Sequence, residues 1–245
     1  MLELFNYPQS TCSQKVRLVL AEKRLEWTSR HLAIDKGEQL EDWYLKINPN
    51  GVVPTLVHDG APVHDSSVIN EYLEDVFPTH PVRPADPLGC AHMRAWRQYF
   101  DEVATPAIRY PTFNAVIARN YAEMSEEKFN ELASRRPLRK HFYLRMGRKG
   151  FSQGDVDAAL DQLRSTLIRM DHALERGPWL VGEQFTIADV SVTPTVVRLE
   201  DLGLDQMWGD LPRVGDWYNR VKARPSFQTA FFPGARDVFA YDQKI

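Results

Sequence analysis

The residue types best suited to chemistry gather near the start of the chain, where Ser10, Cys12 and Ser13 stand within four consecutive positions. They follow a short apolar run and precede apolar residues at helical spacing, so we expect them in the first turn of a helix. The first backbone N–H groups of a helix have no partner inside it, and that end carries a partial positive charge. Because such an end lowers the pKa of a thiol, the stretch predicts a site that holds sulfur as thiolate.

The segments around this stretch predict a domain that mixes strands and helices. We expect strands at Leu2–Phe5 and Trp27–Ile34, with a helix over Ser10–Arg24 between them. An Asp-Gly turn predicts a hairpin at 55–64, and Ser66 is the expected N-cap of the amphipathic helix that follows. This order of elements is typical of an α/β thioredoxin-like domain built on a four-stranded sheet.

The rest of the chain has helical periodicity throughout. Prolines crowd the segment that precedes it, where they exclude a helix or a central strand. Apolar residues repeat at helical spacing over Asp155–Glu175, whereas Pro106 and Pro111 should interrupt the earlier helical segment. We therefore predict three parts, which are an α/β domain at 1–78, a linker at 79–87 and an all-α domain at 88–245.

One helix start in the second half of the chain combines two stabilising patterns. Thr186 is the expected N-cap, and Asp189 stands three residues later, where a capping box places its second side chain. Phe185 and Val190 occupy the flanking positions of a hydrophobic staple. The two patterns together predict a stabilised helix start at Thr186, with Asp189 as part of its cap.

Composition and charge exclude several classes of function. The chain of 245 residues is 43% apolar and 26% charged, which is typical of a folded soluble protein. Its net charge of −3 gives no reason to expect a nucleic-acid partner, and its 7 histidines are dispersed without metal-ligand spacing. No stretch approaches the roughly 18 apolar residues of a membrane helix, and the start does not resemble a signal peptide. We expect a cytoplasmic enzyme without a metal, a nucleic-acid partner or a membrane partner.

Two short motifs in the first third of the chain indicate a specific ligand. Val53 and Pro54 enter a strand of the hairpin, where an apolar–proline bond is a candidate for the cis form. Asp65 and Ser66 enter the next helix. In this order and spacing the motifs resemble the glutathione site of the glutathione S-transferase family. The resemblance implies a cis proline and a pairing of the Val53 backbone with the cysteinyl part of glutathione. By the same resemblance Asp65 and Ser66 hold the γ-glutamyl end, and Gln39 contacts the glycine carboxylate.

The stretch around Ser10 and Cys12 strengthens this resemblance. Its Ser-Thr-Cys-Ser run is similar to the motif of zeta-class members, a group that includes tetrachlorohydroquinone dehalogenases and maleylacetoacetate isomerases. Gln14 and Lys15 follow where the zeta motif usually has Trp-Arg, which weakens the comparison with the isomerases. The bacterial β-aryl etherases are more distantly similar, because they have a related Asn-Pro-x-Gly-x-Val-Pro stretch but lack the Ser-x-Cys run.

The resemblance implies a homodimeric glutathione transferase with an α/β thioredoxin-like domain, an all-α domain and glutathione as cosubstrate. Ser10 takes the place of the hydroxyl that donates a hydrogen bond to the glutathione thiolate, which then attacks a small hydrophobic or aromatic electrophile. Ser13 joins Ser10 and Cys12 as a candidate catalytic residue, and two serines in place of a Cys-x-x-Cys pair disfavour a disulfide oxidoreductase. Two alternatives stay open. One is a glutathione-dependent reductive dehalogenase or β-aryl ether-cleaving enzyme, and the other is a non-catalytic glutathione-binding or stress-response module.

Cys12 and two aromatic residues each have an ordinary and a functional interpretation. Cys12 is either a small buried side chain at a helix start or a redox residue, because its equivalent in the dehalogenases takes glutathione as a mixed disulfide. Tyr110 and Phe113 are either core aromatics or part of the pocket that receives the electrophile.

The segment 135–149 is rich in arginine and lysine. It is either a solvated helix face or a basic rim that attracts an anionic substrate. On the second interpretation, neutralising Arg139 and Lys140 raises KM for an anionic substrate in a salt-dependent way.

Overall fold

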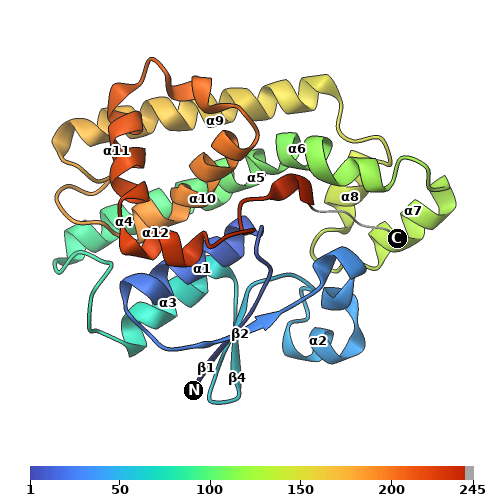
Figure 1. The fold of residues 1–245 in the computed structure, drawn as a ribbon, viewed down its shortest axis with the longest axis horizontal. Coiled ribbons are helices and arrows are strands. Elements are labelled where there is room, and N and C mark those ends of the chain that lie inside the picture. The colour runs from blue at the N-terminus through green and yellow to red at the C-terminus, as the bar shows by residue number, and fades with distance from the viewer. Residues whose placement is uncertain (241–245) are drawn as a thin grey trace.

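The computed structural model describes residues 1–240, and residues 241–245 lie outside that part (Figure 1). The N-terminal part is built on a four-stranded mixed sheet in the order β2-β1-β3-β4. β1 is parallel to β2 and antiparallel to β3, which forms a hairpin with β4. The strands are β1 (Leu2–Asn6), β2 (Thr28–His31), β3 (Thr55–His58) and β4 (Ala61–His64). This arrangement confirms the predicted thioredoxin-like sheet.

The second strand is shorter than the predicted Trp27–Ile34, because it ends at His31. The chain then turns inward, since Leu32 is buried and its N–H donates to the Asn6 carbonyl. A 3-10 turn, η1 (Ile34–Lys36), follows directly. An alternation of apolar and polar residues does not separate a strand from such a buried turn.

Helix α1 (Thr11–Glu22) lies between the sheet and the helical part of the molecule (Figure 1). All residues from Ser13 to Leu20 are buried. α1 packs against three helices, which are α3 (Ser66–Val76), α10 (Ile187–Asp201) and α12 (Pro225–Ala230). Since α1 is covered on so many sides, the position of its first turn is fixed by both parts of the chain.

Helix α3 begins differently from the prediction, because its N-cap is Asp65 and not Ser66. Asp65 has a φ of 71°, and its Oδ1 accepts the N–H groups of Ser67 and Val68 at 2.8 and 3.2 Å. Aspartate and serine are about equally good N-caps, so residue type alone does not decide between two adjacent candidates.

The long helical segment after the linker is interrupted where the prolines predicted it. α4 (Pro87–Tyr99) continues into a π-helical turn, η3 (Phe100–Ala104), and Pro106 and Pro111 then stand in two short helices. A proline lacks the N–H that a regular helix needs and its ring displaces the preceding turn. The segment ends with α5 (Thr105–Ala107), α6 (Arg109–Thr112), a second π-helical turn η4 (Phe113–Ile117) and η5 (Ala118–Asn120).

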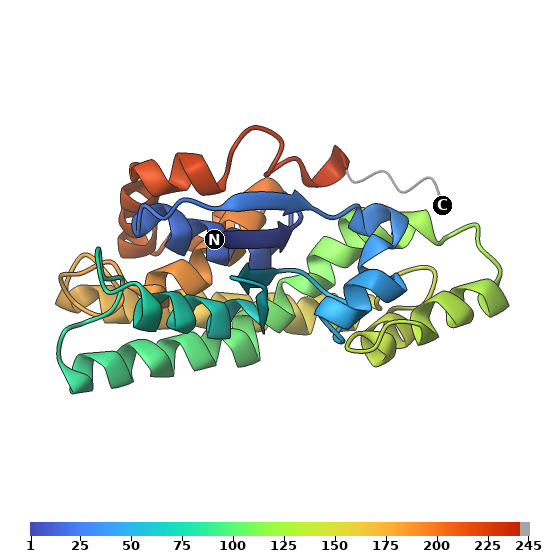
Figure 2. The ribbon, with the colours of Figure 1, turned by 90° about the horizontal axis from the view of Figure 1, so that it is seen from below.

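Most of the remaining helices belong to the all-α part. The helix predicted at 155–175 is α9 (Gln153–Ala173), so that prediction is confirmed to within two residues at each end. The others are α2 (Asp42–Ile47) beside the sheet, α7 (Glu126–Ser134), α8 (Lys140–Met146) and α11 (Pro212–Lys222). α7 and α8 lie at one end of the molecule and α11 at the other (Figure 2). Within residues 1–240, no helix is both long and apolar enough to cross a membrane.

Two hydrophobic cores hold these elements together. The larger core joins the sheet with α1, α9, α10 and α11. The smaller one lies under the segment that connects η4 with α9, and it includes Tyr121, Phe129 and Met146. The basic residues of this segment are therefore carried on a core that is separate from the larger one.

The predicted capping box at the start of α10 is present. Asp189 Oδ2 accepts the N–H of Thr186 at 3.0 Å, and Thr186 Oγ1 accepts the N–H of Ala188 at 3.2 Å. Asp189 Oδ1 also accepts the N–H of Leu180 at 3.0 Å and the indole N–H of Trp217 at 2.9 Å. The carboxylate therefore ties two loops and two helices together inside the core.

Candidate active site

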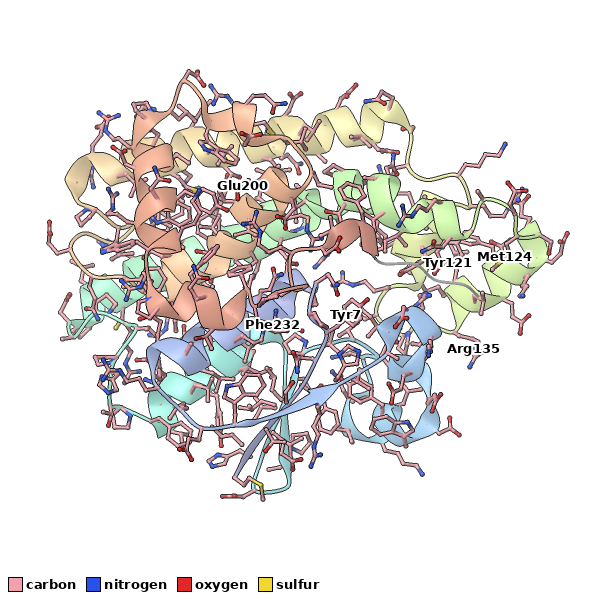
Figure 3. All side chains as sticks on the ribbon, in the orientation of Figure 1. Tyr7, Tyr121, Met124, Arg135, Glu200 and Phe232 are labelled. Atoms are coloured by element: carbon pink, nitrogen blue, oxygen red, sulfur yellow. The ribbon has the colours of Figure 1, made fainter. Side chains whose placement is uncertain are left out.

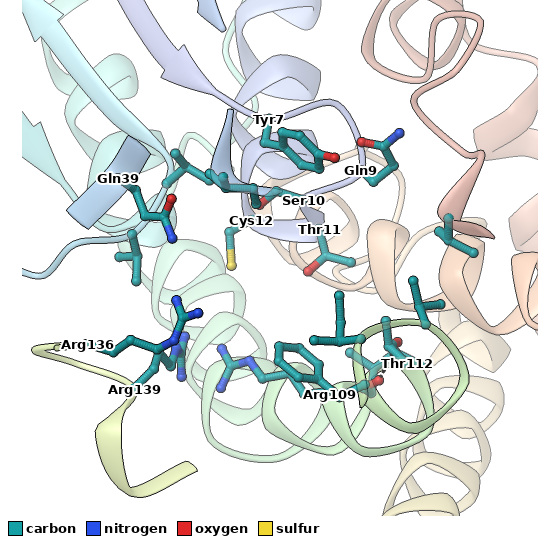
Figure 4. Close-up of a pocket in the computed structure, with 18 of the residues that line it drawn as sticks. Tyr7, Gln9, Ser10, Thr11, Cys12, Gln39, Arg109, Thr112, Arg136 and Arg139 are labelled. Atoms are coloured by element: carbon teal, nitrogen blue, oxygen red, sulfur yellow. Dashed lines mark hydrogen bonds between the residues drawn. The ribbon is translucent and has the colours of Figure 1, made fainter. Parts of the chain in front are cut away.

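A cavity of about 210 Å³ lies between the start of α1 and the helical part of the molecule (Figure 4). Ser10 and Cys12 line it from the start of α1, and Gln39 and Val53 line it from loops beside the sheet. The opposite wall is formed by α6, by η4 and by the residues that directly precede α8. The cavity thus brings together five of the predicted site residues, which are these four and Phe113 on the opposite wall.

Ser10 is the N-cap of α1, with extended backbone angles of φ −70° and ψ 117°. Its Oγ accepts the N–H of Ser13 at 3.2 Å. A hydroxyl that accepts one hydrogen bond still has its own hydrogen to donate, and here the cavity is open to that hydrogen. The first turn of α1 contains no acidic residue, so the partial positive charge of this helix end is not neutralised locally.

Cys12 is the second residue of α1, and its sulfur points into the cavity toward arginine side chains of the opposite wall (Figure 4). Burial lowers the pKa of Arg109 to about 10, and the charge of Arg139 lowers it too, whereas a hydrogen bond to the Cys12 sulfur opposes the shift. Arg109 is therefore cationic at neutral pH. A cation and the N-terminus of α1 therefore both lie beside the Cys12 sulfur.

Gln39 and Val53 line the side of the cavity next to the sheet. Gln39 lies in a 3-10 turn, η2 (Glu38–Leu40), and is 7% exposed, yet its Oε1 has no hydrogen-bond partner among the described residues. A buried amide oxygen without a partner is costly, so an open acceptor beside a cavity indicates a ligand donor. The Val53–Pro54 peptide bond is cis, as the sequence predicted.

Two family models match the chain. The N-terminal domain of glutathione S-transferases matches residues 9–76, and their C-terminal domain matches residues 153–220. Together these matches span more than half of the chain. The chain belongs to the glutathione S-transferase family. Members of this family use glutathione.

Relatives within the family are similar over almost their full length. Protein LigF of Sphingobium sp. strain SYK-6 is 32% identical over 96% of this chain and 95% of LigF. The crystal structure of LigF, a β-etherase, matches with a TM-score of 0.85 over 94% of this chain and 98% of that chain. Tetrachloro-p-hydroquinone reductive dehalogenase of Sphingobium chlorophenolicum is 30% identical over 94% of this chain and 95% of its own. Glutathione S-transferase 1 of Dianthus caryophyllus is 30% identical over 83% of this chain and 80% of its own.

Three of the predicted glutathione-site residues lie outside the cavity lining. Pro54 is buried behind Val53, and Ser66 is buried in the first turn of α3. Asp65 is exposed, and its Oδ1 already accepts two N–H groups of that turn. Asp65 and Ser66 thus form a second helix start next to the loop that carries Val53.

Ser13 does not reach the cavity, although it was a candidate catalytic residue. It is fully buried, and its Oγ accepts the N–H of Tyr7 at 3.4 Å. Its own N–H is the group that Ser10 caps. The structure therefore places Ser13 behind Ser10, where it supports the turn that leads into α1.

Phe113 and Tyr110 occupy different surroundings. Phe113 lines the cavity, as one interpretation of the sequence suggested. Tyr110 is not among the lining residues, and its ring packs 4.4 Å from that of Phe151 and 5.9 Å from that of Phe142. Tyr110 is therefore part of the aromatic packing beneath the wall.

The basic segment 135–149 contributes to the cavity through two residues. Arg136 and Arg139 line it, and the Arg136 guanidinium donates to the Tyr121 hydroxyl at 3.1 Å. Lys140 is exposed and does not line the cavity. Arg135 is also exposed, at the outer edge of the molecule (Figure 3). The segment is thus partly a solvated face and partly a basic wall.

Sequence patterns did not identify three further lining residues, which are Tyr7, Arg109 and Arg198. Burial and the charge of Asp35 raise the pKa of Tyr7 above its usual range, so this phenol stays protonated. Burial lowers the pKa of Arg198 to about 10, and the charge of Asp201 opposes the shift. Arg198 also donates to the Gln9 carbonyl and so fixes the loop before α1.

Proposed function

We propose that this chain is a glutathione transferase that activates the glutathione thiolate for attack on a small hydrophobic or aromatic electrophile. The observation that carries the proposal is the open start of α1, where Ser10 caps the helix and faces the cavity. The Ser10 hydroxyl donates to the sulfur, and the helix end adds its partial positive charge. Both favour the charged form of the sulfur, so the thiol pKa falls and the nucleophile is available near neutral pH.

Four residues support a defined position for glutathione. The Val53 backbone pairs with its cysteinyl part, and Gln39 donates its side-chain N–H to the glycine carboxylate while its Oε1 accepts an N–H near the same end. Asp65 and Ser66 bind the γ-glutamyl ammonium and carboxylate at the start of α3. These roles follow the family pattern, and the open Gln39 acceptor beside the cavity supports them. The family resemblance adds two proposals, which are a cytoplasmic location and a homodimer.

A screen with and without glutathione tests this function. The panel contains halogenated quinols, aryl ethers, epoxides and maleyl acids, and mass spectrometry identifies each product. A product that has gained glutathione, either with loss of a leaving group or with opening of an epoxide ring, supports the proposal. Retention of the chain on immobilised glutathione without turnover of any compound rejects it and favours a non-catalytic binding module.

A second candidate function is reductive dehalogenation, because Cys12 shares the cavity with Arg109. Glutathione first displaces halide from the ring and forms a thioether. The Cys12 thiolate then attacks the thioether sulfur, the aryl carbon takes a proton, and a Cys12–glutathione disulfide forms. A second glutathione thiolate reduces that disulfide and leaves as oxidised glutathione. The sum is one halide replaced by hydrogen and two glutathione molecules oxidised to one disulfide.

The variant Cys12→Ser separates this candidate from simple conjugation. With a chlorinated quinol, a dehalogenase variant makes one equivalent of thioether and then stalls, since serine does not form the disulfide. Simple conjugation instead continues through many turnovers in the variant. Repeated turnover with loss of halide and oxidation of glutathione therefore contradicts a role for Cys12 in dehalogenation.

A further inference from the structure

The cavity has an uneven distribution of charge. No aspartate or glutamate lines it among the described residues. Its charged lining consists of the four arginines Arg109, Arg136, Arg139 and Arg198. Cationic side chains confined without carboxylates repel each other, and a bound anion relieves that repulsion.

Three of these arginines direct their guanidinium groups into the cavity. Arg109, Arg136 and Arg139 project toward Cys12 from the wall opposite Ser10 (Figure 4). Arg198 is instead committed to the Gln9 carbonyl. The three therefore form a cluster on the side that the proposed glutathione residues leave open.

The partners of the three arginines leave donors available. Arg136 is held by the Tyr121 hydroxyl and lies 4.0 Å from the centre of the Tyr143 ring, while its Nε has no partner among the described residues. The Arg139 side chain makes no hydrogen bond or ion pair with any described residue, although it lines the cavity. Held guanidinium groups with open N–H donors suit a carboxylate or a phenolate oxygen.

The rest of the same wall is mostly apolar, with Thr112 and Tyr143 as its polar members. Ile108, Phe113, Val116 and Ile117 line it beside the arginines. A ligand that satisfies both features has an apolar body and one negative charge. An aromatic ring with a carboxylate or a phenolate fits this description.

We propose that the electrophile of this enzyme is an apolar anion, an aromatic carboxylate or phenolate, whose charge is bound by Arg109, Arg136 and Arg139. This inference rests on the proposed function, since it names the second substrate of that site. Glutathione is itself an anion, so its glycine carboxylate is the competing occupant of the arginines. The sulfur of glutathione would then lie between Ser10 and the bound anion, with Cys12 beside it.

A pair of unreactive ligands tests the charge preference directly. 3-Nitrobenzoate and 3-nitrobenzamide have nearly the same shape and differ in charge. Calorimetric titration of the glutathione-saturated enzyme should show benzoate binding at least about tenfold tighter than the amide. Raising the salt concentration should reduce that preference, since the anion site is partly open to solvent.

The variant Arg139→Gln should lower the preference for the benzoate about tenfold and leave binding of the amide unchanged. Lys140→Gln is the matched control, because it removes the same charge from the neighbouring exposed position. Equal binding of benzoate and amide by the unchanged enzyme overturns the proposal. An equal loss of the benzoate preference in Arg139→Gln and Lys140→Gln also overturns it. A rise in the KM of glutathione in Arg139→Gln, with the benzoate preference intact, assigns the arginines to glutathione and also overturns it.

Turnover of 4-chloro-3-nitrobenzoate and its amide separates this inference from the proposed function. Attack by the thiolate at the chlorinated carbon releases chloride and leaves the glutathionyl nitrobenzoate. We expect the kcat/KM for the benzoate to exceed that for the amide, and Arg139→Gln to abolish the difference. Tight benzoate binding without any glutathionyl product rejects the transferase function, whereas turnover of both compounds at equal rates rejects the anion preference.

Discussion

The starts of α1 and α10 use the same local chemistry for different ends. Each helix begins after a hydroxyl residue, Ser10 or Thr186, whose oxygen accepts an N–H of the first turn. They differ three residues later, where α1 has Ser13 and α10 has Asp189. Asp189 closes the end of α10 inside the core, while the end of α1 faces a cavity. One acidic side chain and the residues that cover it thus separate a helix start that is closed inside the core from one that is open to a cavity.

The largest expected effect is a loss of stability at the start of α10, the helix end that Asp189 closes. Asp189→Ala removes the acceptor for three buried N–H groups, those of Leu180, Thr186 and Trp217. Each unpaired buried donor costs about 1–3 kcal/mol, so the free energy of unfolding should fall by roughly 4 kcal/mol. Urea unfolding followed by circular dichroism measures it. Asp161→Ala, at an exposed position of α9, is the control. A loss below about 1 kcal/mol would contradict the folding role of Asp189.

The next effect concerns catalysis at the open end. Ser10→Ala removes the donor to the thiolate, so we expect kcat/KM to fall about 100-fold. The free energy of unfolding should fall by only about 1 kcal/mol, the usual value of an N-cap. Thr186→Ala is the matched variant, because it removes the cap of α10. It should cost a similar stability and leave kcat/KM unchanged. An equal loss of activity in both variants would mean that the two helix starts do not differ in function.

The comparison also shows what local pattern could and could not predict. The capping box at α10 and the cis bond before Pro54 depend on residues within a few positions of each other, and both were predicted. The prolines likewise marked where the segment after α4 breaks. Ser13 was placed in the site because its type suited the chemistry, but hydroxyl residues also serve as buried supports. Periodicity gave no sign that Ser13 points away from the cavity.

The arginine wall could be predicted only in part. Arg139 stood in a basic run, so a rim for anions was one of two interpretations. Arg109 stands far from Cys12 in sequence, and nothing near it indicates that the break after α5 brings the two together. The two residues are brought together only by the packing of the all-α part on α1. Contacts between distant segments carry no local signature, which is why this half of the cavity was not predicted.

The smallest expected effect is the pH dependence of anion binding. The pKa of Arg109 is lowered to about 10, mainly by burial and then by Arg139. An arginine is cationic below its pKa, so its contribution persists at neutral pH and is lost as pH rises through about 10. We expect 3-nitrobenzoate affinity to fall about tenfold across that range, and Arg109→Gln to show a smaller decrease. Since the pKa of Arg198 is also about 10, identical pH profiles for both proteins would assign the effect to Arg198.

The central claim is that the open start of α1 lowers the pKa of a bound glutathione thiol. Titration of the thiolate absorbance of the enzyme–glutathione complex measures that pKa, with the double variant Cys12→Ser and Cys90→Ser as the background so that glutathione is the only thiol. A free thiol of this kind has a pKa of about 8.5, and we predict a value at least about one unit lower in the complex. Adding Ser10→Ala should move it back toward the free value. A bound thiol that titrates like free glutathione, with or without Ser10, would contradict the account.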